Sequence, residues 1–163
     1  MDVIEVMETC SAARYLKPDL VPQELIERVI YAATRGSSPG NSQKWDFIVV
    51  RNPEAKRKIR DLLAPRFKAM RAKMPTTGQS TSRTAAAIHL AETLNEVPDI
   101  IFACGPVAYP PNAPMEQFVW SALYPAAQNL IVPLARSDWA QPSRPFTCLW
   151  KTSSVSCWQS PGR

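Results

Sequence analysis

The residues of this chain best suited to contact a ligand lie together in one short loop. Ser38, Pro39 and Gly40 carry compact side chains or none, and Asn41 and Gln43 offer amides that both donate and accept hydrogen bonds. Such a loop can lay its backbone against a flat ligand and orient that ligand through the two amides. Composition alone favours a plainer interpretation, an ordinary connection between a helix and a strand.

The elements that must position this loop are predicted by the hydrophobic spacing on either side of it. Pro22 stands at a favoured first-turn position, and the apolar residues that follow it keep helical spacing, namely Leu25, Ile26, Val29, Ile30 and Ala33. After the loop, Trp45 anchors the start of an apolar run, and Phe47 to Val50 are predicted to form the first strand. The loop should therefore be held between a packed helix and a core strand.

The remaining helices, strands and loops are predicted from the same kinds of sequence pattern. We expect an opening helix from about Val3 to Cys10. Asn52-Pro53-Glu54 should start a basic helix that is interrupted at Pro65, and residues 75–82 should form a polar loop. A helix from about Arg83 to Asn95, a second strand from Ile100 to Cys104, the turn-rich residues 105–114 and a long, mostly buried central helix complete the pattern.

Composition excludes several classes of protein. With 163 residues, 45% of them hydrophobic and 20% charged, the chain should form one globular domain, and the absence of a signal-like start makes us expect the cytoplasm. Four separated cysteines and one histidine support neither a zinc site nor a disulfide framework. We interpret Cys10 and Cys104 as buried small residues and His89 as structural or solvated. The net charge of +5 is scattered, which favours a solvated helix face over nucleic-acid binding.

Four segments, in order, resemble the FMN-dependent nitroreductase family across residues 1–132. Residues 36–50 are similar to its "PSxxNxQPW" signature, and Ser11 to Pro22 to its "RSxRxFxPDxVP" opening. Residues 97–104 are similar to its second core strand and residues 124–132 to its central helix. Lys44 replaces the usual proline of the first signature and leaves Trp45 in register.

The resemblance implies an α+β fold, a three-layer α-β-α sandwich with a mainly antiparallel central sheet. It also implies a homodimer with two FMN sites at the interface, in which FMN passes hydride from NAD(P)H to a nitroaromatic, quinone or similar acceptor. Arg14 would clamp the FMN phosphate and ribityl chain. Ser11 falls at one of the neighbouring clamp positions, which are Ser11 and Ala12 or Cys10 and Ser11 depending on the alignment. The ring would be lined from the partner subunit by Ser38, Pro39, Gly40, Asn41 and Gln43.

The last part of the chain, residues 133–163, does not resemble the family and shows no sustained period of 3.6 or 2. A shift of the reading frame by one base gives a sequence that does resemble the family. The codons of residues 138–140 then force Leu-Gly and those of residues 150–151 force Glu, and permitted synonymous codons complete a stretch similar to the family's GLG turn and "EDExRxLLxIP" segment. We therefore hypothesise a frameshift near Val132-Pro133, with residues 1–132 as the nitroreductase-like domain and residues 133–163 as a tail that packs irregularly or remains mobile.

Two alternatives to the reductase remain at this point. One is a flavin-dependent dehalogenase or a flavin-cleaving member of the same superfamily, which would need lid residues that we do not identify. The other is a non-catalytic remnant that binds FMN weakly or not at all, because the tail replaces a segment that supplies further strands and a phosphate ligand in the family.

Overall fold

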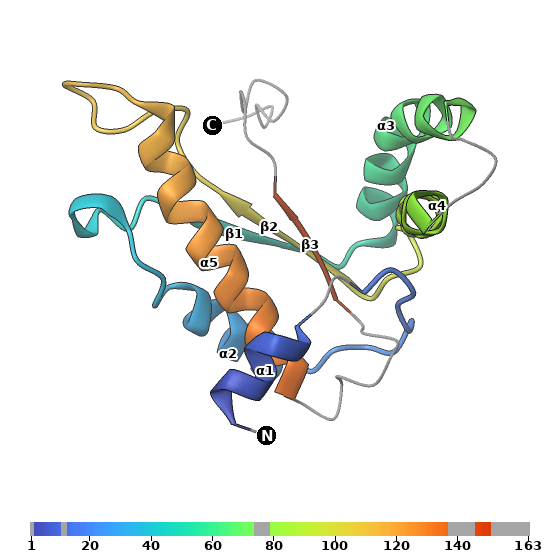
Figure 1. Cartoon of the computed structure of the whole chain (residues 1–163), viewed down its shortest axis with the longest axis horizontal. Coiled ribbons are helices and arrows are strands. Elements are labelled where there is room, and N and C mark those ends of the chain that lie inside the picture. The colour runs from blue at the N-terminus through green and yellow to red at the C-terminus, as the bar shows by residue number, and fades with distance from the viewer. Residues whose placement is uncertain (1, 11–12, 74–78, 137–145, 151–163) are drawn as a thin grey trace.

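The computed structural model describes residues 2–10, 13–73, 79–136 and 146–150. Its sheet has three strands, β1 (Asp46–Val50), β2 (Asp99–Cys104) and β3 (Phe146–Trp150), in the order β1-β2-β3 (Figure 1). β1 and β2 are antiparallel, with Asp46 opposite Cys104 and Val50 opposite Ile100, whereas β2 and β3 are parallel. The chain is α+β, as expected. A mainly antiparallel sheet stays a prediction, because the described strands give one pair of each kind.

Helices α2 (Gln23–Ala33) and α5 (Glu116–Arg136) pack together over one face of the sheet. α2 lies within the predicted range, and its apolar spacing brings the buried residues to the α5 side. The core cluster between these helices and β2 is formed by Val21, Ile26, Val29, Ala33, Ile101, Ala126 and Leu130. Only one face of α5 is buried, because Tyr124 and Phe118 remain 51% and 38% exposed. The expectation of a mostly buried helix therefore holds for that face alone.

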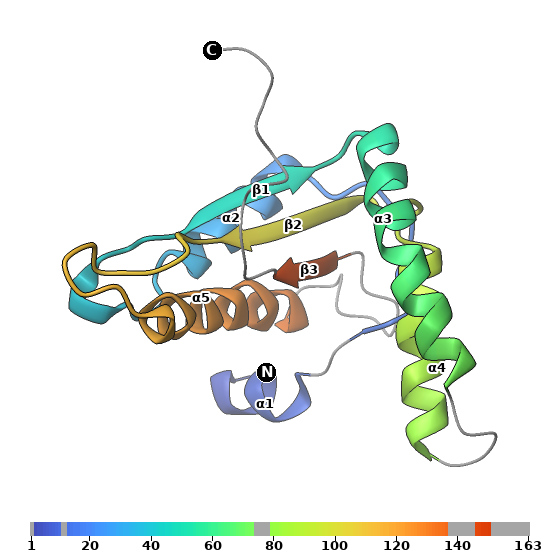
Figure 2. The same cartoon turned by 90° about the horizontal axis from the view of Figure 1, so that it is seen from above.

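Helices α3 (Pro53–Ala72) and α4 (Gln79–Glu92) form a second pair, at the end of the strands opposite the loop before β1 (Figures 1 and 2). A second cluster, Leu90, Leu94, Val97 and Ile100, packs there with partly buried Leu16, Val50, Ile59, Leu63 and Phe102. Asn52 caps α3 as predicted, since its Oδ1 accepts hydrogen bonds from the backbone N–H groups of Glu54 and Ala55.

Two predictions in this region are wrong. Pro65 lies inside α3 without interrupting it. Its ring removes one backbone donor at an exposed position, where water can satisfy the carbonyl of Asp61. The polar loop also ends earlier than expected, because residues 79–82 belong to α4, and serine and threonine are well tolerated in a first helical turn. Residues 75–78 lie outside the described residues.

The two ends of the chain add one helix and one strand to this core. α1 (Val3–Thr9) is capped by Asp2, whose Oδ1 accepts from Glu5 N–H at 2.8 Å, and it contacts α5. At the other end, α5 continues to Arg136 and residues 146–150 form β3, so the expectation that residues 133–163 pack irregularly is wrong for these residues. Residues 137–145 and 151–163 lie outside the described residues. Among the described helices, none has the length and apolarity needed to cross a membrane.

Candidate functional site

The loop before β1 is braced by its own hydrogen bonds. A short 3-10 turn, η1 (Pro39–Asn41), is closed by Asn41 N–H donating to Ser38 O at 3.0 Å and Ser42 N–H donating to Pro39 O at 3.1 Å. Ser38 Oγ accepts from Gln43 N–H at 3.1 Å, and Gln43 Nε2 donates to Asn41 Oδ1 at 3.2 Å. The Asn41 and Gln43 side chains are exposed, so their remaining amide groups face outward.

Three residues of this loop adopt left-handed backbone conformations. Gly40, Asn41 and Gln43 have φ values of 57°, 51° and 50°. Glycine and asparagine adopt this region readily, whereas glutamine does so at a cost. A Cβ placed on Gly40 would meet no atom within 4 Å. Gly40 is therefore required by its φ and not by crowding, and the backbone is open at this residue.

Close packing fixes both ends of the loop. A Cβ on Gly36 would come within 3.0 Å of Ala126 N and 3.2 Å of Ala33 O, so the chain passes directly against α5 as it leaves α2. On the other side, Trp45 is partly buried against the core cluster between α2 and α5. The loop is thus held on both sides by the protein core.

The base of the loop also contacts the end of β2. Cys104 lies opposite Asp46 in the β1–β2 register, and a Cβ on the next residue, Gly105, would come within 3.2 Å of Lys44 O. Burial, and secondarily the negative charge of Asp46, raises the pKa of the Cys104 thiol above its ordinary value of 9.0. The thiol is therefore protonated and a weak nucleophile at neutral pH. This agrees with the interpretation of Cys104 as a small packing residue, although both Cys104 and Cys10 are only partly buried.

The second predicted element of the site, the segment of residues 13–20, lies beside α4. Arg14 is exposed, and Ser11 lies outside the described residues. The ring of the next residue, Tyr15, lies 4.9 Å from the ring of His89, with an interplanar angle of 33°. Leu16 packs against the second core cluster. These contacts hold the Arg14 backbone against α4.

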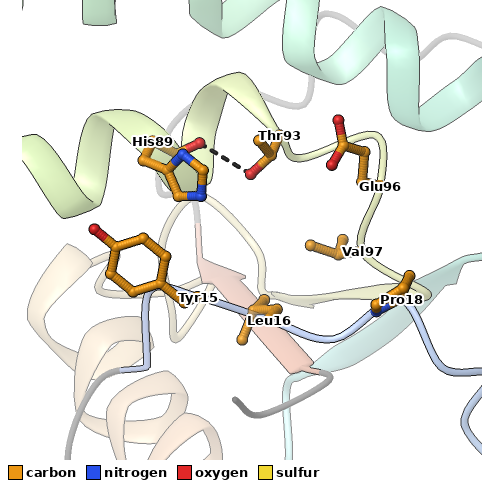
Figure 3. Close-up of a pocket in the computed structure, with 7 residues that line it drawn as sticks. All are labelled: Tyr15, Leu16, Pro18, His89, Thr93, Glu96 and Val97. Carbon is orange, nitrogen blue, oxygen red and sulfur yellow. Dashed lines mark hydrogen bonds between the residues drawn. The ribbon is translucent and has the colours of Figure 1, made fainter. Parts of the chain in front are cut away.

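A pocket of about 170 Å3 opens between this segment and α4 (Figure 3). Figure 3 shows the Tyr15 and His89 rings facing each other at one end, with Thr93 Oγ1 donating to His89 O at 2.9 Å. The lining residues are Tyr15, Leu16, Pro18, His89, Thr93, Glu96 and Val97. Sequence reasoning assigned His89 no place in a site and did not single out Thr93 or Glu96. Thr93 and Glu96 follow His89 by four and seven residues, a helical spacing that was the available signal although α4 ends at Glu92.

Within one chain the two predicted parts of the site do not meet. The loop lies at the end of the sheet where Asp46 pairs with Cys104, and the Arg14 segment lies at the end where Val50 pairs with Ile100 (Figures 1 and 2). The five residues of β1 separate these ends by roughly 13 Å. Arg14 and Asn41 of one chain therefore lie near opposite ends of β1, and the family resemblance implies that each site takes one of them from a second copy.

Curated relatives match this chain over short segments. Iodotyrosine deiodinase 1 of Mus musculus is 36% identical over 59 residues, which cover 36% of this chain and 21% of that protein. A putative NADH dehydrogenase/NAD(P)H nitroreductase of Methanothermobacter thermautotrophicus is 42% identical over 59 residues, which cover 36% of this chain and 31% of that protein. The aligned part of the chain thus spans less than a third of the length of these relatives.

Solved structures match a larger share of the chain. An iodotyrosine deiodinase bound to FMN and 3-iodo-L-tyrosine superimposes with a TM-score of 0.65 at 17% identity, over 82% of this chain and 68% of that one. An FMN-dependent nitroreductase from Clostridium difficile gives a TM-score of 0.58 at 13% identity, over 82% of this chain and 55% of that one. These similarities show that the fold is nitroreductase-like.

The family assignment rests on a longer match. The nitroreductase family model matches residues 9–140, which include the Arg14 segment, the loop at residues 38–43, both strands of the antiparallel pair and α5. This range also extends past residue 132, where we placed the boundary of the tail. Since the match covers well over half of the sequence, the chain belongs to the nitroreductase family.

Proposed function

We propose that this chain is a subunit of a homodimeric, FMN-dependent oxidoreductase that carries electrons from NAD(P)H to a nitroaromatic, quinone or similar acceptor. The observation that carries the proposal is the loop at residues 38–43, which is left-handed and exposed at Gly40, Asn41 and Gln43 and closely packed at both ends. A flat ring needs such a surface of open backbone beside fixed amides. Bound FMN would supply the chemistry, since it accepts a hydride from NAD(P)H and passes the electrons on.

The residues present fit the parts of FMN. The exposed guanidinium of Arg14 suits a phosphate group, because its planar donors match phosphate oxygens. The pocket beside Tyr15 is far too small for a whole FMN and would take only part of it, such as the ribityl chain. Asn41 and Gln43 of a second copy would orient the ring from the opposite side. Ser11 remains a proposed clamp residue on the family resemblance alone.

The separation of the two parts of the site supports the homodimer, and so does the apolar surface of the chain. On α1, Val3, Ile4 and Met7 are 65%, 59% and 60% exposed. α1 contacts α5, on which Tyr124 is 51% exposed. A second copy would bury such side chains and complete two equivalent sites. Sedimentation of the purified chain tests this part of the proposal, which predicts a dimer and is contradicted by a monomer.

The cofactor proposal is tested by flavin binding. We expect the purified chain to carry or take up FMN, seen by its visible absorbance, and Arg14→Ala to weaken FMN by about 1.5–3 kcal/mol, or roughly tenfold or more, through loss of a charge-assisted contact. Lys17→Ala is the matched control, because Lys17 is an exposed cation of the same segment. Equal FMN affinity in Arg14→Ala and the parent would contradict the assigned role of Arg14. A parent chain that binds no FMN would contradict the cofactor proposal for this chain.

Reductive dehalogenation is the second candidate. It is favoured by the similarity to iodotyrosine deiodinases in both the sequence and the structure comparisons. Incubation of the FMN-loaded, chemically reduced protein with 3-iodo-L-tyrosine distinguishes the two activities. Release of iodide at a rate that exceeds reduction of a nitroaromatic would favour the dehalogenase.

A non-catalytic remnant is the third candidate, and it depends on the proposed frameshift near residue 133. Restoring one base there should raise FMN content and NADH or NADPH oxidation if the tail replaces a segment needed for the site. Resequencing the gene in this region is the direct check. A stable dimer of the unmodified chain with one FMN per subunit would rule out the remnant.

A further inference from the structure

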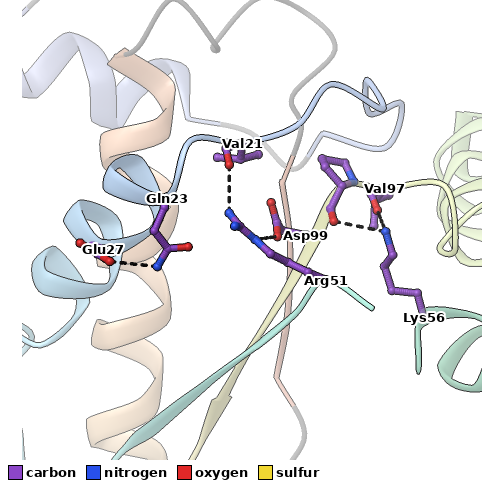
Figure 4. A network of polar contacts seen from close by, with 8 residues as sticks. Val21, Gln23, Glu27, Arg51, Lys56, Val97 and Asp99 are labelled. Atoms are coloured by element: carbon purple, nitrogen blue, oxygen red, sulfur yellow. Dashed lines mark hydrogen bonds and ion pairs between the residues drawn. The ribbon is translucent and has the colours of Figure 1, made fainter. Parts of the chain in front are cut away.

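The guanidinium of Arg51 bonds to Val21 and Asp99, each of which closely follows a segment that lines the pocket (Figure 4). Arg51 directly follows β1, and its Nε donates to Asp99 Oδ1 at 2.6 Å. Its Nη2 donates to the backbone carbonyl of Val21 at 2.9 Å. Asp99 is the first residue of β2, and Val21 ends the segment that carries Arg14 and leads into α2. One side chain therefore connects the N-terminal segment to the central strand.

The burial of Asp99 makes this connection strong. The Asp99 side chain is 2% exposed, so its carboxylate needs a cation, whereas the Arg51 side chain is 45% exposed. Among the described residues, the ion pair with Arg51 is the only one recorded for Asp99. The planar fork of arginine serves the carboxylate and the Val21 carbonyl at once, whereas the single ammonium of lysine lacks this geometry. The geometry thus uses a specific property of arginine.

A second buried cation fixes the neighbouring residues. Lys56 of α3 is 6% exposed, and its Nζ donates to the carbonyls of Val97 at 2.6 Å and Pro98 at 3.2 Å. Three consecutive residues are therefore each bonded to a cation, Val97 and Pro98 to Lys56 and Asp99 to Arg51. Val97 lines one side of the pocket, and Tyr15, Leu16 and Pro18 line the other. The bonds of Lys56 reach the first side alone, whereas those of Arg51 join Asp99, which follows that side, to Val21, which follows the other.

We infer that Arg51 is a positioning residue, which sets the distance between the two walls of the pocket and so the place of Arg14. Arg51 is not among the residues that line the pocket and acts through Val21 and Asp99. The link to FMN rests on the proposed function, but the positioning of the N-terminal segment does not. Substituting Arg51 should move the Tyr15 ring away from His89 and, where FMN binds, weaken it.

The single histidine of the sequence allows a direct test by proton NMR on the full chain. The ring of Tyr15, 4.9 Å from that of His89, shifts the Cε1–H resonance of His89, and Tyr15→Leu provides the reference position without this shift. We expect Arg51→Lys to move the His89 resonance at least halfway toward that reference. The control is Arg57→Lys, because Arg57 is exposed and its ion pair among the described residues is a 3.7 Å contact with exposed Glu54. The control should leave the resonance in place.

The outcomes separate the inference from the proposed function. An unchanged His89 resonance in folded Arg51→Lys overturns the positioning role. Should that variant unfold, as judged by loss of upfield methyl resonances, Arg51→Met combined with Asp99→Asn takes its place, since it leaves no buried charge without a partner. In a parent that binds FMN, we expect Arg51→Lys to weaken FMN three- to tenfold, and unchanged affinity overturns the link to FMN. If the parent binds no FMN, the proposed function fails and the resonance alone decides the positioning role.

Discussion

Substitution of Gly36 tests whether the loop at residues 38–43 depends on the close approach of α2 and α5. The new Cβ of Gly36→Ala would lie 3.0 Å from Ala126 N and 3.2 Å from both Ala33 O and Pro125 C. Ordinary contact begins at 3.4 Å, so 3.4 minus 3.0 and 3.4 minus 3.2 give displacements of 0.4 and 0.2 Å. All three atoms are backbone atoms, which cannot rotate away as a flexible side chain would.

The expected cost follows from this rigidity. Overpacking at a tight contact costs about 1–3 kcal/mol, which for a chain of this size corresponds to roughly 2–12 °C in melting temperature. Urea denaturation followed by circular dichroism gives the free energy of unfolding. We expect Gly36→Ala and Gly36→Asn to be destabilised to a similar extent, because both add the same Cβ.

Gly40 provides the matched control, because a Cβ there meets nothing within 4 Å while φ is +57°. Gly40→Ala should lose about 1–2 kcal/mol through the left-handed backbone alone. Gly40→Asn should lose less, since asparagine tolerates that region. Full stability of Gly36→Ala would refute the argument from crowding. A larger loss in Gly40→Asn than in Gly36→Asn would show that the two glycines have been assigned the wrong roles.

Three further changes probe the loop, the pocket wall and the thiol. Asn41→Ala should slow flavin reduction in FMN-loaded protein more than it lowers the free energy of unfolding, because a methyl group cannot replace the amide that we propose orients the ring. Unchanged NAD(P)H oxidation would assign Asn41 to turn geometry. Lys56→Met should cost about 1–3 kcal/mol in urea denaturation by leaving two carbonyls without a donor, and a neutral result would mean that water replaces the ammonium. Cys104 should react with iodoacetamide more slowly than free cysteine at pH 8.5, as followed by peptide mass spectrometry, because its raised pKa leaves less thiolate. Because folding raises the pKa of the Cys104 thiol, the contribution of this thiol to stability should be complete below pH 9.0 and fall as the pH rises through the pKa of the folded thiol. A stability that rises over that range would contradict the raised pKa.

The sequence predicted best the elements whose signals are local. α2 and the loop after it were recognised because apolar spacing and turn residues act over a few positions, and the structure confirms both. Pro65 misled the prediction because the cost of a helical proline depends on whether water reaches the freed carbonyl, which no local pattern records. The network of Arg51, Asp99 and Lys56 was missed for a related reason. It joins residues that are more than 40 positions apart, and no short motif encodes such a contact.

The pairing of β3 with β2 in the last part of the chain also could not be predicted from local sequence patterns. Residues 146–150 showed no alternation that would predict a strand, yet they lie parallel to β2. A buried central strand offers backbone donors and acceptors to any extended segment that reaches it, so pairing there depends little on side-chain pattern. The assignment of residues 133–163 to a frameshifted tail stays a prediction.

The placement of Arg14 and Asn41 at opposite ends of the sheet has a genetic consequence. If each site combines the Arg14 segment of one subunit with the loop of the other, two inactive variants can repair each other. In a dimer of one Arg14→Ala and one Asn41→Ala subunit, one site carries both defects and the other carries neither. Random mixing of equal amounts would give about half mixed dimers, and therefore restore about a quarter of all sites. Two alleles that each abolish activity would then complement when expressed together, whereas two alleles with defects in the same segment would not.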